Sequence, residues 1–320
     1  MLHAGDYRIA LDMREPDANL SFISHAHTDH IAWARGKVKT LASRETAMVL
    51  QARDGIRLNY VESVDGMEML DAGHVIGSKQ LRVEADGNVV TYSGDFQMQR
   101  SEVAAPIQVK QADIVILDST YHYPGVVFDS REEVISAMHK YISDKLEKGI
   151  VLFGAYPFGK SQEIIKICNN IGVAPLVNRR ICLINRVYQE CGISLDYISM
   201  MDSESEYSKS MNGNFVAVVD SNKLDMVRDR LAIKLRKKVY TAVATGWAKT
   251  MRYNTDVQFA LSDHADFEQA TQYIDQCGAK AVYTKGYGAE AFAATLSAAG
   301  YNAAPYSKYL KTTAAMENQG

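Results

Sequence analysis

The chain has 320 residues, of which 47% are hydrophobic and 23% are charged. This composition is typical of a soluble globular protein and excludes disordered and fibrous classes. The length favours two domains, or one domain with a large insertion. The formal net charge of −3 excludes a strong overall positive field, although a local basic groove for nucleic acid remains compatible with it.

The cysteines, the amino-terminal residues and the hydrophobic runs together predict a cytoplasmic protein with no membrane partner. The four cysteines form no C-x-x-C pair, which indicates reduced thiols. The chain opens with "MLHAGDYRIALD", which lacks the apolar core of a secretory signal. No apolar run approaches the roughly 20 residues that a membrane-spanning helix needs.

The first 120 residues are rich in predicted strands. Short alternating or β-branched runs such as "YRIALD", "LSFISH", "QLRVEA", "NVVTYSGD" and "DIVILDS" are separated by glycine, aspartate and asparagine. One helix is predicted at residues 43–53, with Ser43 as its N-cap and acidic character in its first turn.

The pattern changes near residue 129, where strands and helices begin to alternate. A helix is predicted from Asp129 or Ser130 to Gly149, followed by "IVLFGAY", "GKSQEIIKICNN", "APLV", "RRICLINRVYQECG" and "NFVAVVD". This alternation is typical of a parallel α/β unit. We therefore predict a main domain from residues 1–124 and 239–310, an inserted α/β domain at 125–238, and a frayed tail at 311–320.

The densest group of potential metal ligands is the stretch "SHAHTDH", directly after the apolar run "LSFI". In an extended segment His25 and His27 point the same way and can hold one ion. Asp29 and His30 diverge after the turn and can hold a second ion. A polar loop with chance histidines is the alternative, but so many ligand types at this spacing favour a metal site.

Other histidines and acids fall where predicted strands end: Asp12, His74, Asp95, Asp118 and His264. Side chains at the same ends of neighbouring strands meet at one edge of a sheet. We expect His74 to complete the first metal site and Asp95 to bridge both sites. Mixed imidazole and carboxylate ligands suit zinc, with iron and manganese as alternatives.

These motifs resemble those of a known family. "SHAHTDH", "DAGHVIGS" and "YSGDF" are similar to the second, third and fourth motifs of the metallo-β-lactamase superfamily, with Asp12 at the place of the first. "LDSTYH", "FGKSQEI", "TGWAKT" and "LSDHADF" narrow the resemblance to its β-CASP branch of metal-dependent nucleases. It covers roughly residues 5–308 and implies an αββα sandwich with an inserted β-CASP cap domain.

The resemblance also implies roles for individual residues. His25, His27 and His74 match ligands of the first metal, Asp29 and His30 match ligands of the second, and Asp95 matches the bridging carboxylate. Asp118 matches the motif A acid, and His264 matches the motif B histidine near the scissile phosphate. In that mechanism Asp29 orients or deprotonates the attacking water, and His264 protonates the leaving oxygen.

One position departs from the family pattern. Where RNA-cleaving relatives carry a histidine and DNA-repair relatives a valine, "AVYTKGYGAE" carries Lys285 before Gly286. An ammonium group is not a usual metal ligand at neutral pH. We therefore expect one full zinc site and a second that is weak or partly filled, unless Lys285 contacts the substrate phosphate instead.

A second anion site is predicted at "FGKSQEI". Gly159 opens a helix there, so backbone N–H groups, Lys160 and Ser161 could hold a phosphate, although a plain helix start is an equal alternative. The basic run of Lys234, Arg236, Lys237 and Lys238 is more typical of an exposed helix face than of a nucleic-acid cleft.

The leading functional prediction is a β-CASP nuclease that acts on single-stranded RNA in RNA processing, as mRNA 3′-end processing factors do. Because a cap domain implies that substrate passes between two domains, a single strand is expected to fit better than a duplex. A DNA exonuclease of the ligase-associated or cross-link-repair type is the alternative. A third hypothesis, of a different class, is a catalytically weak nucleic-acid-binding scaffold. Assembly as a homodimer is compatible with the sequence.

Overall fold

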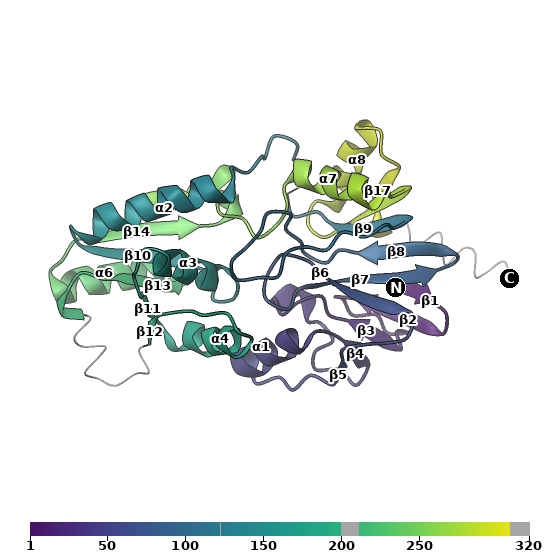
Figure 1. The fold of residues 1–320 in the computed structure, drawn as a ribbon, viewed down its shortest axis with the longest axis horizontal. Helices are drawn as coiled ribbons and strands as arrows, with labels where there is room; N and C mark the ends of the chain where they lie inside the picture. The colour runs from purple at the N-terminus through teal and green to yellow at the C-terminus, as the bar shows by residue number, and fades with distance from the viewer. Residues whose placement is uncertain (122, 200–210, 308–320) are drawn as a thin grey trace. The chain divides into compact units, whose positions relative to one another are not determined.

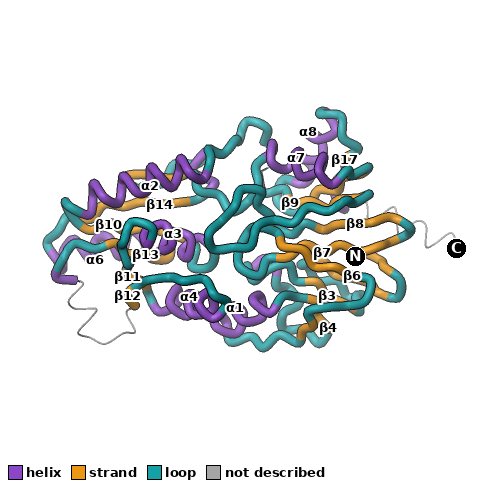
Figure 2. Tube along the Cα trace, in the orientation of Figure 1, coloured by secondary structure: helices purple, strands orange, loops and turns teal. Residues whose placement is uncertain are grey.

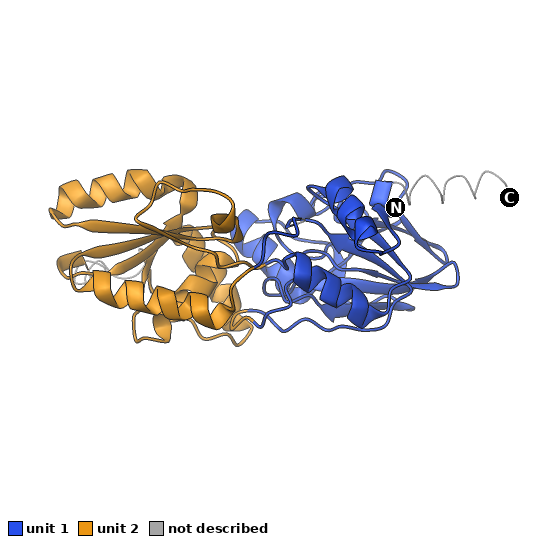
Figure 3. Cartoon of the chain, turned by 90° about the horizontal axis from the view of Figure 1, so that it is seen from above, with its two compact units in different colours: residues 1–100, 104–127, 264–320 blue, residues 101–103, 128–263 orange. Residues whose placement is uncertain are grey.

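The computed structural model describes residues 1–121, 123–199 and 211–307, so the predicted tail at 311–320 lies outside the described residues. The chain divides into two compact units, coloured separately in Figure 3. Unit 1 contains residues 1–100, 104–127 and 264–320, and unit 2 contains residues 101–103 and 128–263. The segment from 128 to 263 is thus an insertion in the chain of unit 1.

Unit 1 contains two sheets. The first has the order β1-β2-β3-β4-β5, with β1 antiparallel to β2 and the other pairs parallel. The second has the order β17-β16-β9-β8-β7-β6, in which β6, β7 and β8 are antiparallel and the remaining pairs are parallel. The strands are β1 (Leu2–Ala4), β2 (Tyr7–Leu11), β3 (Leu20–Phe22), β4 (Lys39–Leu41), β5 (Tyr60–Val61), β6 (Met67–Asp71), β7 (Lys79–Ala85), β8 (Asn88–Tyr92), β9 (Ile114–Asp118), β16 (Ala281–Lys285) and β17 (Ala303–Pro305).

The two sheets pack face to face around one apolar core, because alternate residues of each strand point inward. Ile9, Leu20 and Phe22 of the first sheet lie in the same buried cluster as Leu81 and Val90 of the second. The helices of unit 1 are α1 (Arg44–Asp54), α7 (Phe267–Cys277) and α8 (Ala289–Ala298), with a short 3₁₀ turn η1 (Thr28–His30).

Helices cover the outer faces of this sandwich. Tyr273 of α7 and Phe292 of α8 pack in a second buried cluster with Val115 and Val282 of the second sheet. Figure 1 shows α7 and α8 beside β9 and β17, and α1 on the opposite side of the unit near β4 and β5. The predicted αββα sandwich is therefore confirmed.

Unit 2 is built on one parallel sheet of order β12-β11-β13-β10-β14-β15. Its strands are β10 (Ile150–Ala155), β11 (Leu176–Val177), β12 (Ile198–Ser199), β13 (Val216–Asp220), β14 (Val239–Ala244) and β15 (Val257–Phe259). Its helices are α2 (Arg131–Leu146), α3 (Lys160–Asn169), α4 (Arg179–Glu190) and α6 (Leu224–Leu235), with 3₁₀ turns η2 (Ser221–Lys223) and η3 (Gly246–Lys249). Figure 2 shows the helices and strands of this unit alternating along the chain, as the sequence pattern predicts.

Two helix starts follow the predicted capping chemistry. The Ser43 side chain accepts a hydrogen bond from the Thr46 N–H at the start of α1. Ser130 and Glu133 form a reciprocal capping box at the start of α2, which settles the choice between Asp129 and Ser130. Both caps satisfy backbone N–H groups that have no partner within the helix.

The inserted segment ends later in the structure than the predicted residue 238. Strands β14 and β15 pair in parallel with β10 and with each other, so their hydrogen bonds join them to the sheet of unit 2. The sequence of a short β-branched run does not indicate which sheet the strand joins, because the strand with which it pairs depends on tertiary packing. Among the described residues, no helix is long and apolar enough to cross a membrane.

Candidate metal centre

Three imidazoles and one carboxylate converge at one edge of the unit 1 sandwich. His25 and His27 follow β3, His74 lies in the turn after β6, and Asp95 follows β8. His25 Nε2 lies 2.9 Å from His27 Nδ1, and His74 Nε2 lies 3.0 Å from the same nitrogen. Asp95 Oδ2 lies 3.5 Å from His25 Nε2 and 3.8 Å from His74 Nε2. The four ligand atoms all lie within 4.8 Å of one another.

Sheet topology explains this convergence. Strands β6 and β8 end at the same edge of their sheet, since both are antiparallel to β7. The segment after β3 of the other sheet is held at this edge by a hydrogen bond from the Lys79 N–H to the Ser24 carbonyl at 2.8 Å. Residues that directly follow these strands therefore meet, although His27 and His74 are 47 positions apart. The sequence prediction that strand-end residues gather at one edge matches this arrangement.

The donor set fits a bound cation. His25 is 0% exposed, and burial holds the pKa of its imidazole well below the ordinary value, so its ring is neutral and offers a lone pair. Burial alone would raise the pKa of Asp95, but the imidazoles of His30 and His264 hold it well below the ordinary value. Three imidazole nitrogens and one carboxylate oxygen around one point are a combination typical of zinc.

His30 lies beside this cluster, between acidic groups. Its Nδ1 lies 2.8 Å from Asp12 Oδ2, and its Nε2 lies 3.3 Å from Asp95 Oδ2 and 3.5 Å from Asp29 Oδ2. Burial would lower the pKa of His30, but Asp95 and Asp12 raise it well above its ordinary value. The hydrogen bond with His30 is the main reason that the pKa of Asp29 falls to about 2. The Asp29 side chain is 82% exposed, so it faces solvent as a carboxylate.

Asp12 contacts His30 at Nδ1 and is itself held by several hydrogen bonds. Its carboxylate accepts hydrogen bonds from the backbone N–H and the hydroxyl of Ser24, at 2.7 and 2.5 Å, and from the Tyr92 hydroxyl at 2.8 Å. Asp12 has a φ of 55°, a left-handed conformation that non-glycine residues seldom adopt. Such strain persists only where surrounding contacts enforce it, and the hydrogen bonds of this carboxylate provide that enforcement.

Asp118 and His264 form a pair next to the metal cluster. His264 Nδ1 lies 3.0 Å from Asp118 Oδ2, and His264 Nε2 faces Asp95 Oδ2 at 3.9 Å. The other Asp118 oxygen accepts hydrogen bonds from the backbone N–H and the hydroxyl of Thr120. Asp95, Asp118 and His264 also form a group whose ligand atoms could hold a cation. The pair was predicted from strand ends, and the structure brings it together.

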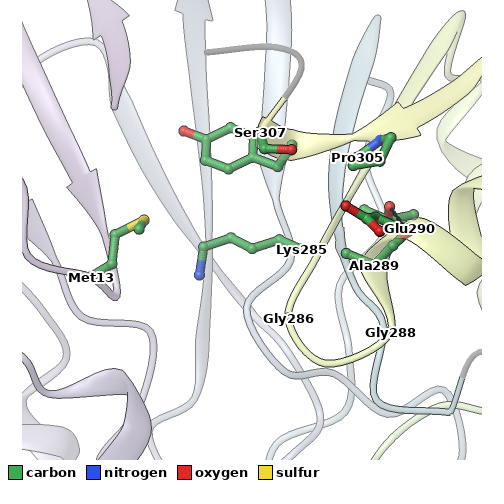
Figure 4. Close-up of a pocket in the computed structure, with 10 residues that line it drawn as sticks. Met13, Lys285, Gly286, Gly288, Ala289, Glu290, Pro305 and Ser307 are labelled. Carbon is green, nitrogen blue, oxygen red and sulfur yellow. Dashed lines mark hydrogen bonds between the residues drawn. The ribbon is translucent and has the colours of Figure 1, made fainter. Parts of the chain in front are cut away.

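Lys285 ends β16 and stands opposite Asp118 in the register with β9. Its ammonium lies 3.4 Å from the Tyr92 hydroxyl and 5.3 Å from the centre of the Tyr92 ring. It also lines a cavity of about 410 Å³ together with Met13, Gly286, Gly288 and Glu290. Figure 4 shows the Lys285 side chain extending toward Met13, with the glycine loop and Glu290 on the other side.

Lys160 and Ser161, predicted to hold a phosphate, have intramolecular partners in unit 2. The Lys160 side chain is 2% exposed, donates to Glu163 Oε2 at 2.8 Å and lies 3.7 Å from Asp263 Oδ1. The Ser161 hydroxyl donates to the Tyr156 carbonyl at 2.7 Å. A phosphate at this helix start would have to displace these contacts, whose partners cannot be identified from the local sequence.

The sequence motifs did not predict a role for three residues of the site. These are Ser24 and Tyr92, which donate hydrogen bonds to Asp12, and Gln97, which donates to the His264 carbonyl. Ser24 directly precedes His25, so its position was a usable signal. Tyr92 and Gln97 flank the "SGDF" motif, but neither residue type marks a metal site. Their contacts span 80 and 167 positions and become visible only in the folded chain.

Comparison with known proteins supports the resemblance. No protein-family model matches the chain. It is 29% identical over 300 residues to a protein of Opitutus terrae named "Probable DNA ligase", covering 88% of this chain and 28% of that one. It is 28% identical over 180 residues to an RNase J-like protein of Methanocaldococcus jannaschii, covering 46% and 42% of the two chains. It is 25% identical over 250 residues to the DNA cross-link repair protein SNM1 of Arabidopsis thaliana, covering 71% and 49%.

Relatives such as the RNase J-like protein and SNM1 are metallo-β-lactamase/β-CASP nucleases, and the chain is similar to this branch. It spans less than half the length of each of these three relatives. A crystal structure of a protein of unknown function from Enterococcus faecalis matches with a TM-score of 0.56 at 16% identity, covering 85% of this chain and 76% of that one. That likeness concerns the fold alone. The chain carries its histidine and aspartate motifs on the sandwich unit and its insertion between β9 and α7.

Proposed function

We propose that the protein is a metal-dependent phosphodiesterase that hydrolyses single-stranded RNA and takes part in RNA processing. The observation that carries this proposal is the cluster of His25, His27, His74 and Asp95 directly beside the Asp118–His264 pair. A Lewis-acid site and a histidine that can transfer protons together can supply the nucleophile and the leaving-group proton for phosphodiester hydrolysis at neutral pH. Both lie within unit 1.

Zinc is the metal we propose for this cluster, because three imidazoles and one carboxylate are its typical donors. When bound, zinc supplies charge neutralisation for the phosphate and makes water a nucleophile at neutral pH. We assign the second group, Asp29 and His30 with Asp95, to a weaker site.

The chain's own residues have separate roles in this proposal. The Asp29 carboxylate is exposed and ionised, so it can accept a proton from the attacking water. Asp118 accepts a hydrogen bond from His264 Nδ1, which leaves Nε2 to protonate the leaving oxygen as an imidazolium. The Lys285 ammonium lines a cavity and can contact a phosphate oxygen.

A DNA substrate is the second candidate. The relative matched over 88% of this chain carries the name "Probable DNA ligase", whereas the RNase J-like relative is matched over 46%. Residues Lys160 and Ser161 enter neither candidate as phosphate contacts, since Lys160 donates to the buried Glu163 carboxylate and Ser161 donates to the Tyr156 carbonyl.

The test compares cleavage of labelled single-stranded RNA, single-stranded DNA and RNA duplex of one sequence, with zinc content measured on the same preparation. We expect RNA to be cleaved fastest and the duplex slowest. His27→Ala should lose the first zinc and all cleavage, and Asp118→Asn should keep that zinc while turnover falls by about 100-fold.

The matched control is His139→Ala, which changes a histidine on α2 whose Nε2 contacts the Ile167 carbonyl. It should leave zinc content and cleavage unchanged. Faster cleavage of DNA would select the second candidate. Zinc binding without cleavage of any substrate would support a nucleic-acid-binding scaffold instead.

A further inference from the structure

Gln97 is a buried polar residue that lies two positions after Asp95 and contacts the backbone of His264. It is 1% exposed. Its side-chain amide donates a hydrogen bond to the His264 carbonyl at 2.7 Å. Its side-chain oxygen accepts a hydrogen bond from the Gln99 N–H at 2.9 Å, which fixes the orientation of the amide. The NH₂ group of Gln97 is therefore directed at His264.

The backbone around Gln97 joins two further parts of the site. The Gln97 N–H donates to the Ala72 carbonyl at 3.0 Å, two residues before His74. The Ala265 N–H donates to the Phe96 carbonyl at 2.7 Å, directly after His264. The two residues that follow Asp95 thus form hydrogen bonds on both sides, to the loop of His74 and to the loop of His264.

The fit between Gln97 and the His74 loop is close. A Cβ atom added at Gly73 would lie 2.3 Å from the Gln97 carbonyl oxygen, and Gly73 has a φ of 79°. Only glycine permits both this approach and this backbone conformation. The position of Gln97 relative to His74 is therefore fixed by the backbone. Gln97 can in turn hold His264, which it contacts through its side chain, in a fixed position.

The ring of His264 contacts the Asp118 carboxylate through Nδ1 at 3.0 Å. That contact sets the rotation of the ring but does not fix the backbone from which the ring extends. The backbone is held by Gln97 at the His264 carbonyl and by Phe96 at the Ala265 N–H. Both anchors belong to the segment that carries Asp95.

We infer that Gln97 is a positioning residue that holds His264 at the correct distance from the metal-binding cluster. The inference rests on the proposed function, since it assigns the placement of the histidine that protonates the leaving oxygen. A proton donor displaced by about 1 Å can lose about 100-fold in rate without loss of substrate binding. Gln97 therefore acts on turnover through His264 and does not touch the substrate.

The test is Gln97→Glu, which keeps the size of the side chain but places a carboxylate oxygen against the His264 carbonyl. The matched control is Gln80→Glu. Gln80 is equally buried, and its amide donates to the carbonyls of Asp71 and Gln108, away from His264. The two variants lose the same type of donor from the same unit, so general destabilisation should affect them equally.

We expect kcat of Gln97→Glu to fall about 100-fold with KM and first-site zinc content unchanged. Gln80→Glu should stay within about twofold of the original kcat at a temperature where both variants are folded. An unchanged kcat in Gln97→Glu, or an equal loss in both variants, would overturn the inference.

A second measurement is independent of catalysis. Ring nitrogen resonances of ¹⁵N-histidine-labelled protein can be followed by NMR, with the His264 signals assigned by their loss in His264→Asn. Gln97→Glu should shift the His264 signals and leave those of His139 in place, and Gln80→Glu should shift neither. If the original protein proves inactive, the proposed function fails, but shifted His264 signals still support the positioning role. Unshifted His264 signals would contradict it.

Discussion

A single side chain at the end of β16 separates this chain from the family pattern. Lys285 stands opposite Asp118 in the register, where related enzymes carry histidine or valine, and its ammonium contacts the Tyr92 hydroxyl. Tyr92 in turn donates to Asp12, which binds His30. The lysine is therefore linked to His30 of the second group through a chain of three hydrogen bonds, without contacting that histidine itself.

Lys285→His should raise the zinc content of the second site. A histidine nitrogen is available as a ligand above its reference pKa of about 6.5, whereas a lysine amine must first lose a proton with a reference pKa of about 10.4. We expect metal content per chain to rise toward two equivalents by elemental analysis, with faster cleavage.

Lys280→His is the matched control, because Lys280 precedes the same strand and pairs with Asp113 at the surface. It should leave the metal content unchanged. A gain of metal with weaker substrate binding in Lys285→His would assign the lysine to phosphate contact. Unchanged metal content would show that the ligand at this position does not limit the second site.

At the level of elements, the start of α3 is a buried ionic junction. Glu163 accepts hydrogen bonds from Arg131 of α2 and from Lys160, and all three side chains are almost fully buried. Arg131 also donates to the Ser262 carbonyl at 2.6 Å. Removal of one member of such a group leaves a buried charge without its partner, which costs about 3–5 kcal/mol of stability.

This junction should make the stability of unit 2 depend on pH. Burial would raise the pKa of Glu163, but Arg131 and Lys160 lower it below the reference value of 4.5. Because the folded-state pKa lies below the unfolded one, the stabilisation is complete above about pH 4.5 and is lost as the pH falls through the folded-state pKa. Glu163→Gln should therefore be less stable at pH 7, and the difference should shrink in more acidic solution.

Urea unfolding at pH 7 and at successively lower pH measures this difference. Glu132→Gln is the control, since Glu132 lies one position after Arg131 in the first turn of α2 and is exposed. It should change stability by only a few tenths of a kcal/mol at any of these pH values. A Glu163→Gln difference that is constant with pH would contradict the pairing.

At the level of the whole molecule, the metal centre lies in the unit that the insertion interrupts. Its ligands come from the segments that follow β3 of the first sheet and β6 and β8 of the second sheet. A cation held there binds the folded state only, because the ligands separate on unfolding. Metal binding therefore adds to the stability of unit 1.

Removal of metal with a chelator should lower the melting temperature. A metal present at 100 times its dissociation constant contributes about 2.7 kcal/mol to stability. Calorimetry with and without chelator measures the shift, and restoring zinc should reverse it. The melting temperature of His27→Ala should not respond to the chelator. An equal response in that variant would mean that the stabilising ion binds elsewhere.

The sequence by itself determined the ligand types, their order along the chain and the division into a strand-rich part with an inserted α/β segment, whereas the αββα architecture was implied by the family resemblance. Closely spaced motifs such as His25-x-His27 and hydrophobic alternation depend on neighbours within a few residues, so they can be read without a structure. Strand ends then predicted which residues would share one edge of a sheet.

Only the tertiary structure decided the partners of each group. It placed Lys160 in a buried ion pair, gave Asp12 the hydroxyls of Ser24 and Tyr92, and set Gln97 against His264. It also joined β14 and β15 to the sheet of unit 2. The physical reason is that the hydrogen-bonded residues of Tyr92–Asp12 and Gln97–His264 are 80 and 167 positions apart in the sequence. Such residues meet only when whole sheets and helices pack against one another, and the local sequence does not encode that packing.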